Sequence, residues 1–272
     1  MSRRPSKEDI FAACCINKKI QDRIQQTAQD LVDAEEFVSD VVGGIYRSAI
    51  IYGPPGLGKT HLVESALRRA GHKIGETYLV ARSHTTPRQL YAMLYCMRKK
   101  GQFLIIDDCD AVLTDESGLN ILKAATDDSF RTVGWATSKA GVRLPDGTEV
   151  PDEFQFNGSV LIATNVRQAV RGKTAQHFAA LRSRCPGWQL HYDTIADQFA
   201  YVVHMIIDRN YLDHNPETTL TWPQKIELIR FIMSKLSQIE RLDLRRPQHI
   251  AKVMRHKTKW QNHALKFLKE PA

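Results

Sequence analysis

The glycine-rich segment at residues 53–60, Gly-Pro-Pro-Gly-Leu-Gly-Lys-Thr, limits the fold of this chain more than any other feature. It fits the pattern G-x-x-x-x-G-K-[ST], and it lies between an apolar run at 48–52 and a helix predicted from about 59 to 70. Glycines let such a loop curl until its N–H groups point at phosphate oxygens, and the helix N-terminus adds partial positive charge. Lys59 would reach the β- and γ-phosphates, and Thr60 would give its hydroxyl to Mg²⁺. We therefore expect a nucleotide site made by Gly53, Pro54, Pro55, Gly56, Leu57, Gly58, Lys59, Thr60 and His61.

An acidic pair follows another apolar run. Residues 103–106, Phe-Leu-Ile-Ile, predict a buried strand, and Asp107 and Asp108 come directly after it, where open α/β sheets bind ligands. We expect Asp107 to orient the Mg²⁺ shell and Asp108 to act as general base on the attacking water. The alternative is an acidic cap on the following helix, a role that also suits Asp110.

An amide and an arginine pair complete the set of candidate catalytic groups. Asn165 comes at the end of a strand predicted over 159–163, and we expect it to hold the attacking water from the side opposite Asp108. The alternative is an Asx turn that closes the strand. Arg182 and Arg184 lie at the end of a predicted helix, where cationic side chains are also ordinary partners of the helix dipole.

Strand and helix patterns alternate through the middle of the chain. Apolar runs predict strands at 48–52, 77–81, 103–106, 159–163 and 188–192. One of the helices between them is expected to begin at Thr86-Pro87 and to run to Lys100. This alternation predicts an α/β fold with a parallel sheet covered on both faces. A turn signal at 145–147, Pro-Asp-Gly, predicts a hairpin that projects from the domain over 131–150.

Helical patterns alone occupy both ends of the chain. One covers 8–42, and the others cover about 194–211, 222–239 and 247–268. We therefore expect a helical lead-in over residues 1–44, an α/β domain over 45–193, and a small helical domain over 194–272.

Positive charge is concentrated near the C-terminal end. The chain of 272 residues has a net charge of +8, and residues 241–272 carry nine Lys/Arg against two acidic residues, which leaves +7 there. This asymmetry is typical of a surface for a polyanion, so we expect DNA as a partner; the alternative is a solvated helix face. No run approaches the ~18–20 apolar residues of a membrane span, and the five cysteines lack ligand spacing. We expect no membrane contact, no zinc site and no disulfide framework.

Four motifs together give the chain a family resemblance. Their order and approximate spacing are similar to the Walker A, Walker B, sensor-1 and arginine-finger elements of AAA+ ATPases: GPPGLGKT at 53–60, LIIDD at 104–108, ATN at 163–165 and RSRC at 182–185. The resemblance covers about residues 45–257. It implies an AAA+ parallel-sheet P-loop ATPase domain with a small C-terminal all-helical lid, ATP and Mg²⁺ as cofactors, ATP hydrolysis, and assembly into a homo-oligomeric ring or spiral.

The resemblance also assigns roles to arginines. It implies that Arg184 is the finger that reaches the γ-phosphate of a neighbouring subunit. Leu244-Arg245 resembles the start of the sensor-2 helix, and Arg246 is equally well placed. Many AAA+ proteins have Asp-Glu in Walker B, whereas this chain has Asp107-Asp108, and the shorter base implies slow turnover.

Finer resemblances favour a DNA-associated role. Asp-Asp in Walker B and GLGKTHL at 56–62 are similar to the bacterial replication-initiator and helicase-loader group. The predicted hairpin and the segment 154–158, Phe-x-Phe-x-Gly, are most similar to ATPases of bacteriophages and mobile elements. We expect helicase or clamp loading, replication or phage DNA metabolism, with a replication or phage protein as partner, in the cytoplasm of a bacterial or phage-infected cell.

Other functions stay open at this point. A protein-remodelling AAA+ chaperone is one alternative, although residues 82–101 contain no aromatic–Gly pore loop. An assembly scaffold that binds ATP and hydrolyses it little is the other.

Overall fold

The computed structural model describes residues 4–135, 141–165 and 173–269. The chain forms two compact units, which are described separately. The sheet unit comprises Asp33–Gly53 and Gly58–Leu190. The helical unit comprises Met1–Val32, Pro54–Leu57 and His191–Ala272. The long helix α2 (Lys18–Val42) contributes residues to both.

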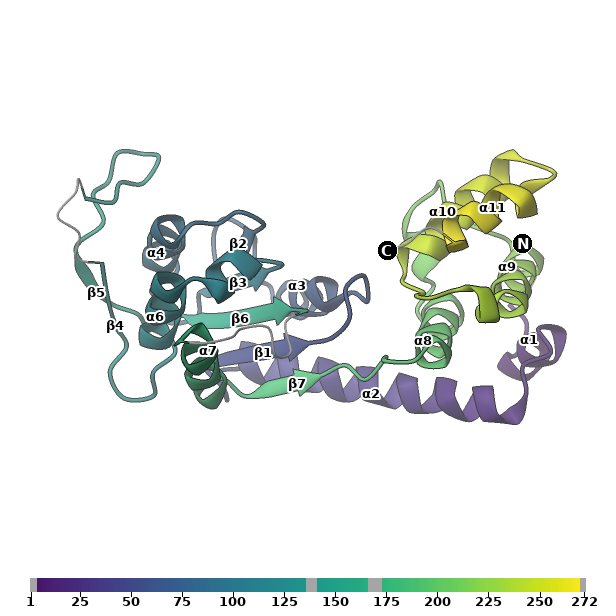
Figure 1. Cartoon of the computed structure of the whole chain (residues 1–272), viewed down its shortest axis with the longest axis horizontal. Coiled ribbons are helices and arrows are strands. Elements are labelled where there is room, and N and C mark those ends of the chain that lie inside the picture. Colours follow the sequence, from purple (N-terminus) through teal and green to yellow (C-terminus); the bar gives the residue numbers. More distant parts are fainter. Residues whose placement is uncertain (1–3, 136–140, 166–172, 270–272) are drawn as a thin grey trace. The chain divides into compact units, whose positions relative to one another are not determined.

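The sheet unit is built on a five-stranded parallel sheet in the order β2-β3-β6-β1-β7 (Figure 1). Its strands are β1 (Ser48–Tyr52), β2 (Tyr78–Arg82), β3 (Phe103–Asp107), β6 (Ser159–Thr164) and β7 (Gly187–Gln189). Side chains on both faces of β1 are buried, as expected for a parallel sheet covered by helices. The covering helices include α3 (Lys59–Arg69), α4 (Pro87–Cys96), α5 (Asp110–Thr114), α6 (Glu116–Ala125) and α7 (Lys173–Arg184). The predicted α/β parallel-sheet fold is confirmed.

The parallel order brings the polar strand ends together. Tyr52 of β1 is in register with Thr164 of β6, and Asp107 of β3 is in register with Ala163 of β6. Since all of these strands run in one direction, the segments that follow β1, β3 and β6 emerge at the same edge of the sheet.

Some element bounds differ from the prediction. Helix α4 ends at Cys96, whereas the sequence predicted Lys100. Just beyond the helix, the carbonyl of Arg98 accepts a hydrogen bond from the N–H of Asn157, so a tertiary contact takes the place of helical hydrogen bonding there. The last strand, predicted at 188–192, is β7, which begins and ends earlier. Helix α5 was not predicted.

The predicted hairpin is only partly correct. The turn is present at Gly147, whose φ of 87° is in the left-handed region, and its N–H donates to the carbonyl of Leu144. However, β4 (Thr132–Gly134) pairs antiparallel with β5 (Glu153–Gln155), not with the run that precedes or follows the turn. The turn therefore closes a smaller loop, bridged by Arg143 and Glu149, and residues 136–140 of the predicted hairpin lie outside the described residues.

The helical unit confirms the predicted C-terminal helical region. It contains α1 (Lys7–Ala13), α8 (Ile195–Ile207), η1 (Tyr211–His214), α9 (Trp222–Ser234), η2 (Leu236–Gln238), α10 (Arg245–His256) and α11 (Trp260–Lys269). All four predicted helical patterns are divided. The pattern over 8–42 breaks where Cys15 has a φ of 57°. The pattern over 194–211 stops at Ile207 and η1 follows, and that over 222–239 stops at Ser234 and η2 follows. The pattern over 247–268 breaks between His256 and Trp260, and Trp260 packs on Phe231 with ring centroids 4.8 Å apart. Among the described residues, no helix combines the length and the apolar character that crossing a membrane requires.

Candidate nucleotide site at the carboxyl edge of the sheet

The glycine loop has the backbone that its sequence predicts. Gly56 and Gly58 have φ values of 76° and 77°, a region that residues with a Cβ rarely adopt. Gly58 is the N-cap of α3, so the helix begins at Lys59. The first N–H groups of a helix have no acceptor within it, and they carry the positive end of the helix dipole. The segment therefore offers N–H donors and positive potential at one point.

Lys59 connects the loop to the neighbouring strand β6. Its side chain is buried, with 6% of the residue exposed. The ammonium donates to the carbonyl of Gly53 at 2.9 Å and to Oδ1 of Asn165 at 2.6 Å. A buried ammonium is costly unless oxygens surround it, so these contacts hold Lys59 at the carboxyl edge of the sheet.

Asp107 and Thr60 form the second contact at this edge. The Thr60 hydroxyl donates a hydrogen bond to Oδ1 of Asp107. Arg82, at the end of β2, places its Nε 3.7 Å from Oδ2 of Asp107. Burial raises the pKa of Asp107, while the hydrogen bond from Thr60 and the charge of Arg82 act in the opposite direction. A hydroxyl beside a carboxylate is an oxygen donor set of the kind that Mg²⁺ prefers.

Asp108 has an unusual backbone. Its φ is 48°, and it is one of few residues other than glycine with positive φ in the described chain. Such a conformation costs on the order of 1–3 kcal/mol and is found preferentially at functional sites. The side chain is exposed, and its Oδ1 accepts a hydrogen bond of 3.1 Å from Nδ2 of Asn165. Asn165 therefore contacts both Lys59 and Asp108.

ATP and Mg²⁺ fit the residues present in the sheet unit. The left-handed Gly58 at the start of α3 gives a cradle for phosphate, and a buried ammonium lies beside it. Thr60 and Asp107 supply adjacent oxygen donors for a divalent cation. The structure thus brings together Lys59, Thr60, Asp107, Asp108 and Asn165, which the sequence predicted from separate motifs.

The tip of the glycine loop belongs to the helical unit. There the carbonyl of Pro55 accepts a hydrogen bond from Arg241, and that of Gly56 accepts one of 3.2 Å from the N–H of Leu244. A Cβ on Gly56 would lie 2.7 Å from the side chain of Asp243, so only glycine fits this close approach. His61, in the first turn of α3, is exposed and lies 3.3 Å from the hydroxyl of Ser65.

The two candidate sensor-2 arginines differ sharply in their surroundings. Arg246 is buried, and its Nη1 donates to the carbonyl of Leu268 at 2.6 Å, inside the contact between α10 and α11. Arg245 is exposed at the first position of α10.

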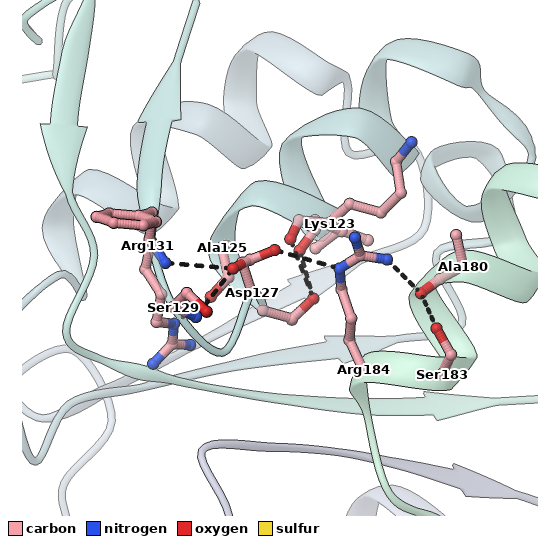
Figure 2. A network of polar contacts seen from close by, with 11 residues as sticks. Lys123, Ala125, Asp127, Ser129, Arg131, Ala180, Ser183 and Arg184 are labelled. Carbon is pink, nitrogen blue, oxygen red and sulfur yellow. Dashed lines mark hydrogen bonds and ion pairs between the residues drawn. The ribbon is translucent and has the colours of Figure 1, made fainter.

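Arg184 lies at the other edge of the sheet. It is the last residue of α7, and the chain then enters β7, whose Gly187 is in register with Ile50 of the parallel strand β1. Arg184 therefore lies near the amino ends of the strands, whereas the glycine loop follows the carboxyl end of β1. Its Nη1 donates to the carbonyl of Ala180 at 2.8 Å, and its Nε lies 3.5 Å from Oδ2 of Asp127 (Figure 2). The structure does not bring Arg184 to the other predicted site residues of the same chain.

Sequence reasoning missed Arg82 and Asp127. Arg82 directly follows the strand predicted at 77–81, and its register with Asp107 could be inferred once β2 and β3 are known to be neighbours. The only sequence signal for Asp127 is the Asp-Asp-Ser run that favours an Asx turn.

The fold and the site together define a P-loop nucleotide-binding protein. Residues 49–171 match the family model of AAA, the ATPase family associated with various cellular activities. The family match and the fold together confirm the predicted AAA+ resemblance of this part of the chain.

One phage protein and the solved structures of two bacterial proteins are similar to this chain. A 36.7 kDa protein from the nrdC-mobD intergenic region of Enterobacteria phage T4 is 28% identical over 236 residues, which cover 85% of this chain and 70% of the relative. Domain III of the replication initiation protein DnaA from Thermotoga maritima has a TM-score of 0.51 at 14% identity, covering 88% of this chain and 92% of that one. A mutant RuvB from Thermotoga maritima has a TM-score of 0.49 at 15% identity, covering 98% of this chain and 72% of that one. The phage relative agrees with the resemblance to phage ATPases.

Proposed function

We propose that this chain is an ATP-hydrolysing AAA+ subunit that works as a homo-oligomer on DNA. The observation that carries the proposal is the connection made by Asn165, whose amide contacts the buried Lys59 on one side and Asp108 on the other. A phosphate-binding ammonium, a water-positioning amide and a carboxylate base are then within reach of one reacting group.

Each residue has a distinct task in the proposed reaction. Bound ATP with Mg²⁺ supplies the γ-phosphoryl group that is transferred to water. Thr60 and Asp107 hold the cation, and Lys59 neutralises phosphate charge. Asn165 positions the water, and Asp108 accepts its proton, a role that its exposed carboxylate supports. Asp107 is unsuited to the task of base because its oxygens already face Thr60 and Arg82.

Two arginines have further proposed roles. Arg184 lies at the amino edge of its own sheet, which supports action on the nucleotide of a second subunit. The burial of Arg246 supports Arg245 as the sensor-2 residue. Arg246 is then a structural residue that joins α10 to α11.

Lys59→Ala tests the nucleotide site itself. We expect ATP affinity to fall by about 30-fold or more, since losing one partner of a buried charge pair costs about 2–5 kcal/mol. Titration with a labelled ATP measures the affinity, and Lys18→Ala, which changes a lysine whose side chain is 81% exposed, is the matched control. Undiminished affinity in Lys59→Ala would contradict the proposed phosphate loop.

The DNA part of the proposal needs a revised set of contacts. If residues 247–268 formed one helix, as the sequence predicted, Lys252, Arg255 and Lys259 would lie on nearby faces of it. However, α10 ends at His256. Lys252 pairs with Glu217 at 2.6 Å, and Arg255 donates to main-chain carbonyls, including that of Thr219 at 3.1 Å. Both side chains therefore already have partners within the helical unit. The lysines that stay exposed in this segment, and that pair with no carboxylate among the described residues, are Lys257, Lys259 and Lys266.

Reversing these three charges tests the DNA proposal. We expect DNA affinity to fall and the slope of log K against log salt to flatten by about 2.7, because each phosphate contact contributes about −0.9. Binding to single- and double-stranded DNA is measured across a salt series, and assembly is measured on the same protein. The control reverses exposed lysines elsewhere and has the same net charge: Lys18, Lys19 and Lys73→Glu. Impaired assembly with unchanged DNA affinity would show that the lysines serve contacts between subunits.

A further inference from the structure

The turn that follows α6, residues 126–131, is tied to Arg184 through one carboxylate (Figure 2). Oδ1 of Asp127 accepts hydrogen bonds from the N–H groups of Ser129 at 2.9 Å and Phe130 at 3.2 Å. Oδ2 of the same carboxylate lies 3.5 Å from Nε of Arg184. The two N–H donors hold the pKa of Asp127 below its ordinary value, so the carboxylate is ionised at neutral pH. Asp127 thus shapes the turn and holds the guanidinium at once.

The turn displays Phe130 to solvent on a fixed backbone. Phe130 is 82% exposed, more than any other large hydrophobic residue in the described chain. At one end of the turn, the buried Thr126 hydroxyl donates to the carbonyl of Leu122 at 2.8 Å. At the other end, Arg131 is buried and donates to the carbonyls of Ala125 at 2.7 Å and Gly158 at 2.9 Å. A large apolar side chain on an anchored turn loses little freedom when a partner covers it.

The position of Arg184 determines what that partner is. Arg184 and the turn lie at the amino edge of the sheet, and the phosphate loop follows the carboxyl end of β1. An arginine that serves a phosphate from this edge must serve one held by another molecule. The carboxylate of Asp127 contacts both the N–H of Phe130 and the guanidinium of Arg184. A partner that covers Arg184 will therefore also lie near the Phe130 ring.

We propose that residues 126–131 and Arg184 form the docking surface for the nucleotide site of a second copy of this chain. Phe130 is the apolar contact of that surface, and Asp127 is the positioning residue that orients Arg184. The inference rests on the proposed function, because it assumes that Arg184 acts on the nucleotide of another subunit.

Asp127→Asn separates orientation of the arginine from folding of the turn. An amide oxygen can still accept the N–H groups of Ser129 and Phe130, but an NH₂ group then faces Arg184 in place of a carboxylate. We expect unchanged ATP affinity and assembly, with kcat lower by about 10²-fold, the effect typical of a misplaced catalytic group. Asp146→Asn, which changes an exposed aspartate that likewise accepts an N–H group of its own turn, should keep the parent kcat.

A double variant distinguishes positioning from a general structural defect. If Asp127 acts only through Arg184, Asp127→Asn should lower kcat no further once Arg184 is alanine. Additive losses in the double variant would overturn the positioning role.

Phe130→Ser tests the docking surface. Phe130 would lose its burial at the interface, so we expect assembly with ATP and Mg²⁺ to weaken by about 10- to 100-fold per interface. Ile74→Ser, at a hydrophobic residue that is 61% exposed just before β2, is the matched control. Sedimentation over a concentration series measures assembly, and equal assembly by the two variants would overturn the inference.

The Arg184→Ala variant, measured alongside, separates the two proposals. If Arg184→Ala keeps the parent rate, the proposed function and this inference both fail. If Arg184→Ala is slow while Asp127→Asn and Phe130→Ser behave like their controls, the inference alone fails.

Discussion

Arg184→Ala should bind ATP as the parent chain does and hydrolyse it about 10³–10⁵-fold more slowly, the range measured for arginine fingers in related phosphoryl-transfer systems. The guanidinium acts on charge that develops in the transition state, so its loss leaves ground-state binding intact. The position of Arg184 supports the proposed action on another subunit, because Arg184 precedes the amino end of β7 and the phosphate loop follows the carboxyl end of β1.

Mixing two inactive variants checks this action between subunits. Combined with Lys59→Ala, the Arg184→Ala protein should regain part of the activity, since some interfaces then pair an intact loop with an intact arginine. Arg182→Ala is the matched control, because Arg182 is exposed one half-turn earlier on α7. A monomer that is fully active at high protein concentration with ATP and Mg²⁺ would contradict the prediction.

Asp108→Asn should bind ATP and lose about 10²–10⁴-fold in the rate of hydrolysis, because an amide cannot accept the proton of the attacking water. The substitution is geometrically conservative. An asparagine oxygen can still accept the hydrogen bond from Nδ2 of Asn165, and asparagine tolerates the left-handed backbone that Asp108 adopts. A lower rate of ATP hydrolysis would therefore result from the loss of the general base.

Single-turnover hydrolysis measures this effect separately from product release. Asp110→Asn, measured in parallel, tests the nearest alternative carboxylate in the sequence. If Asp108→Asn turns over at the parent rate, the base is another group.

The parallel sheet was predictable because its strands are short apolar runs bounded by polar residues. The divisions between helices could not be predicted from the sequence. The break between α10 and α11 falls at Lys257-Thr258-Lys259, which contains neither glycine nor proline, and the apolar spacing on both sides continues the same pattern. The break after α1 depends on a left-handed cysteine, a conformation that sequence gives no reason to expect. In both places tertiary packing overrides local preference.

The candidate site likewise contains residues that the sequence identified and residues that it did not. Residues that follow a glycine loop or a strand end, such as Lys59, Asp107 and Asn165, were identified because local sequence places them at one edge of the sheet. Arg82 and Asp127 were missed because their contacts depend on which elements lie side by side. The buried state of Arg246, which separates it from Arg245, likewise depends on the packing of α11. The proposed roles and the domain boundaries stay predictions.

The described part of the insertion between β4 and β5 has an aromatic anchor at its base. The Tyr91 hydroxyl of α4 donates to the carbonyl of Pro151 at 2.7 Å, and its ring lies 5.1 Å from that of Phe154. The Pro-Asp-Gly turn at 145–147 is exposed or nearly so and takes no part in this aromatic contact. Changes in the turn should therefore cost the fold little, so selection is free to alter it. Over evolutionary time, substitutions should therefore accumulate faster at this turn than at Tyr91 and Phe154.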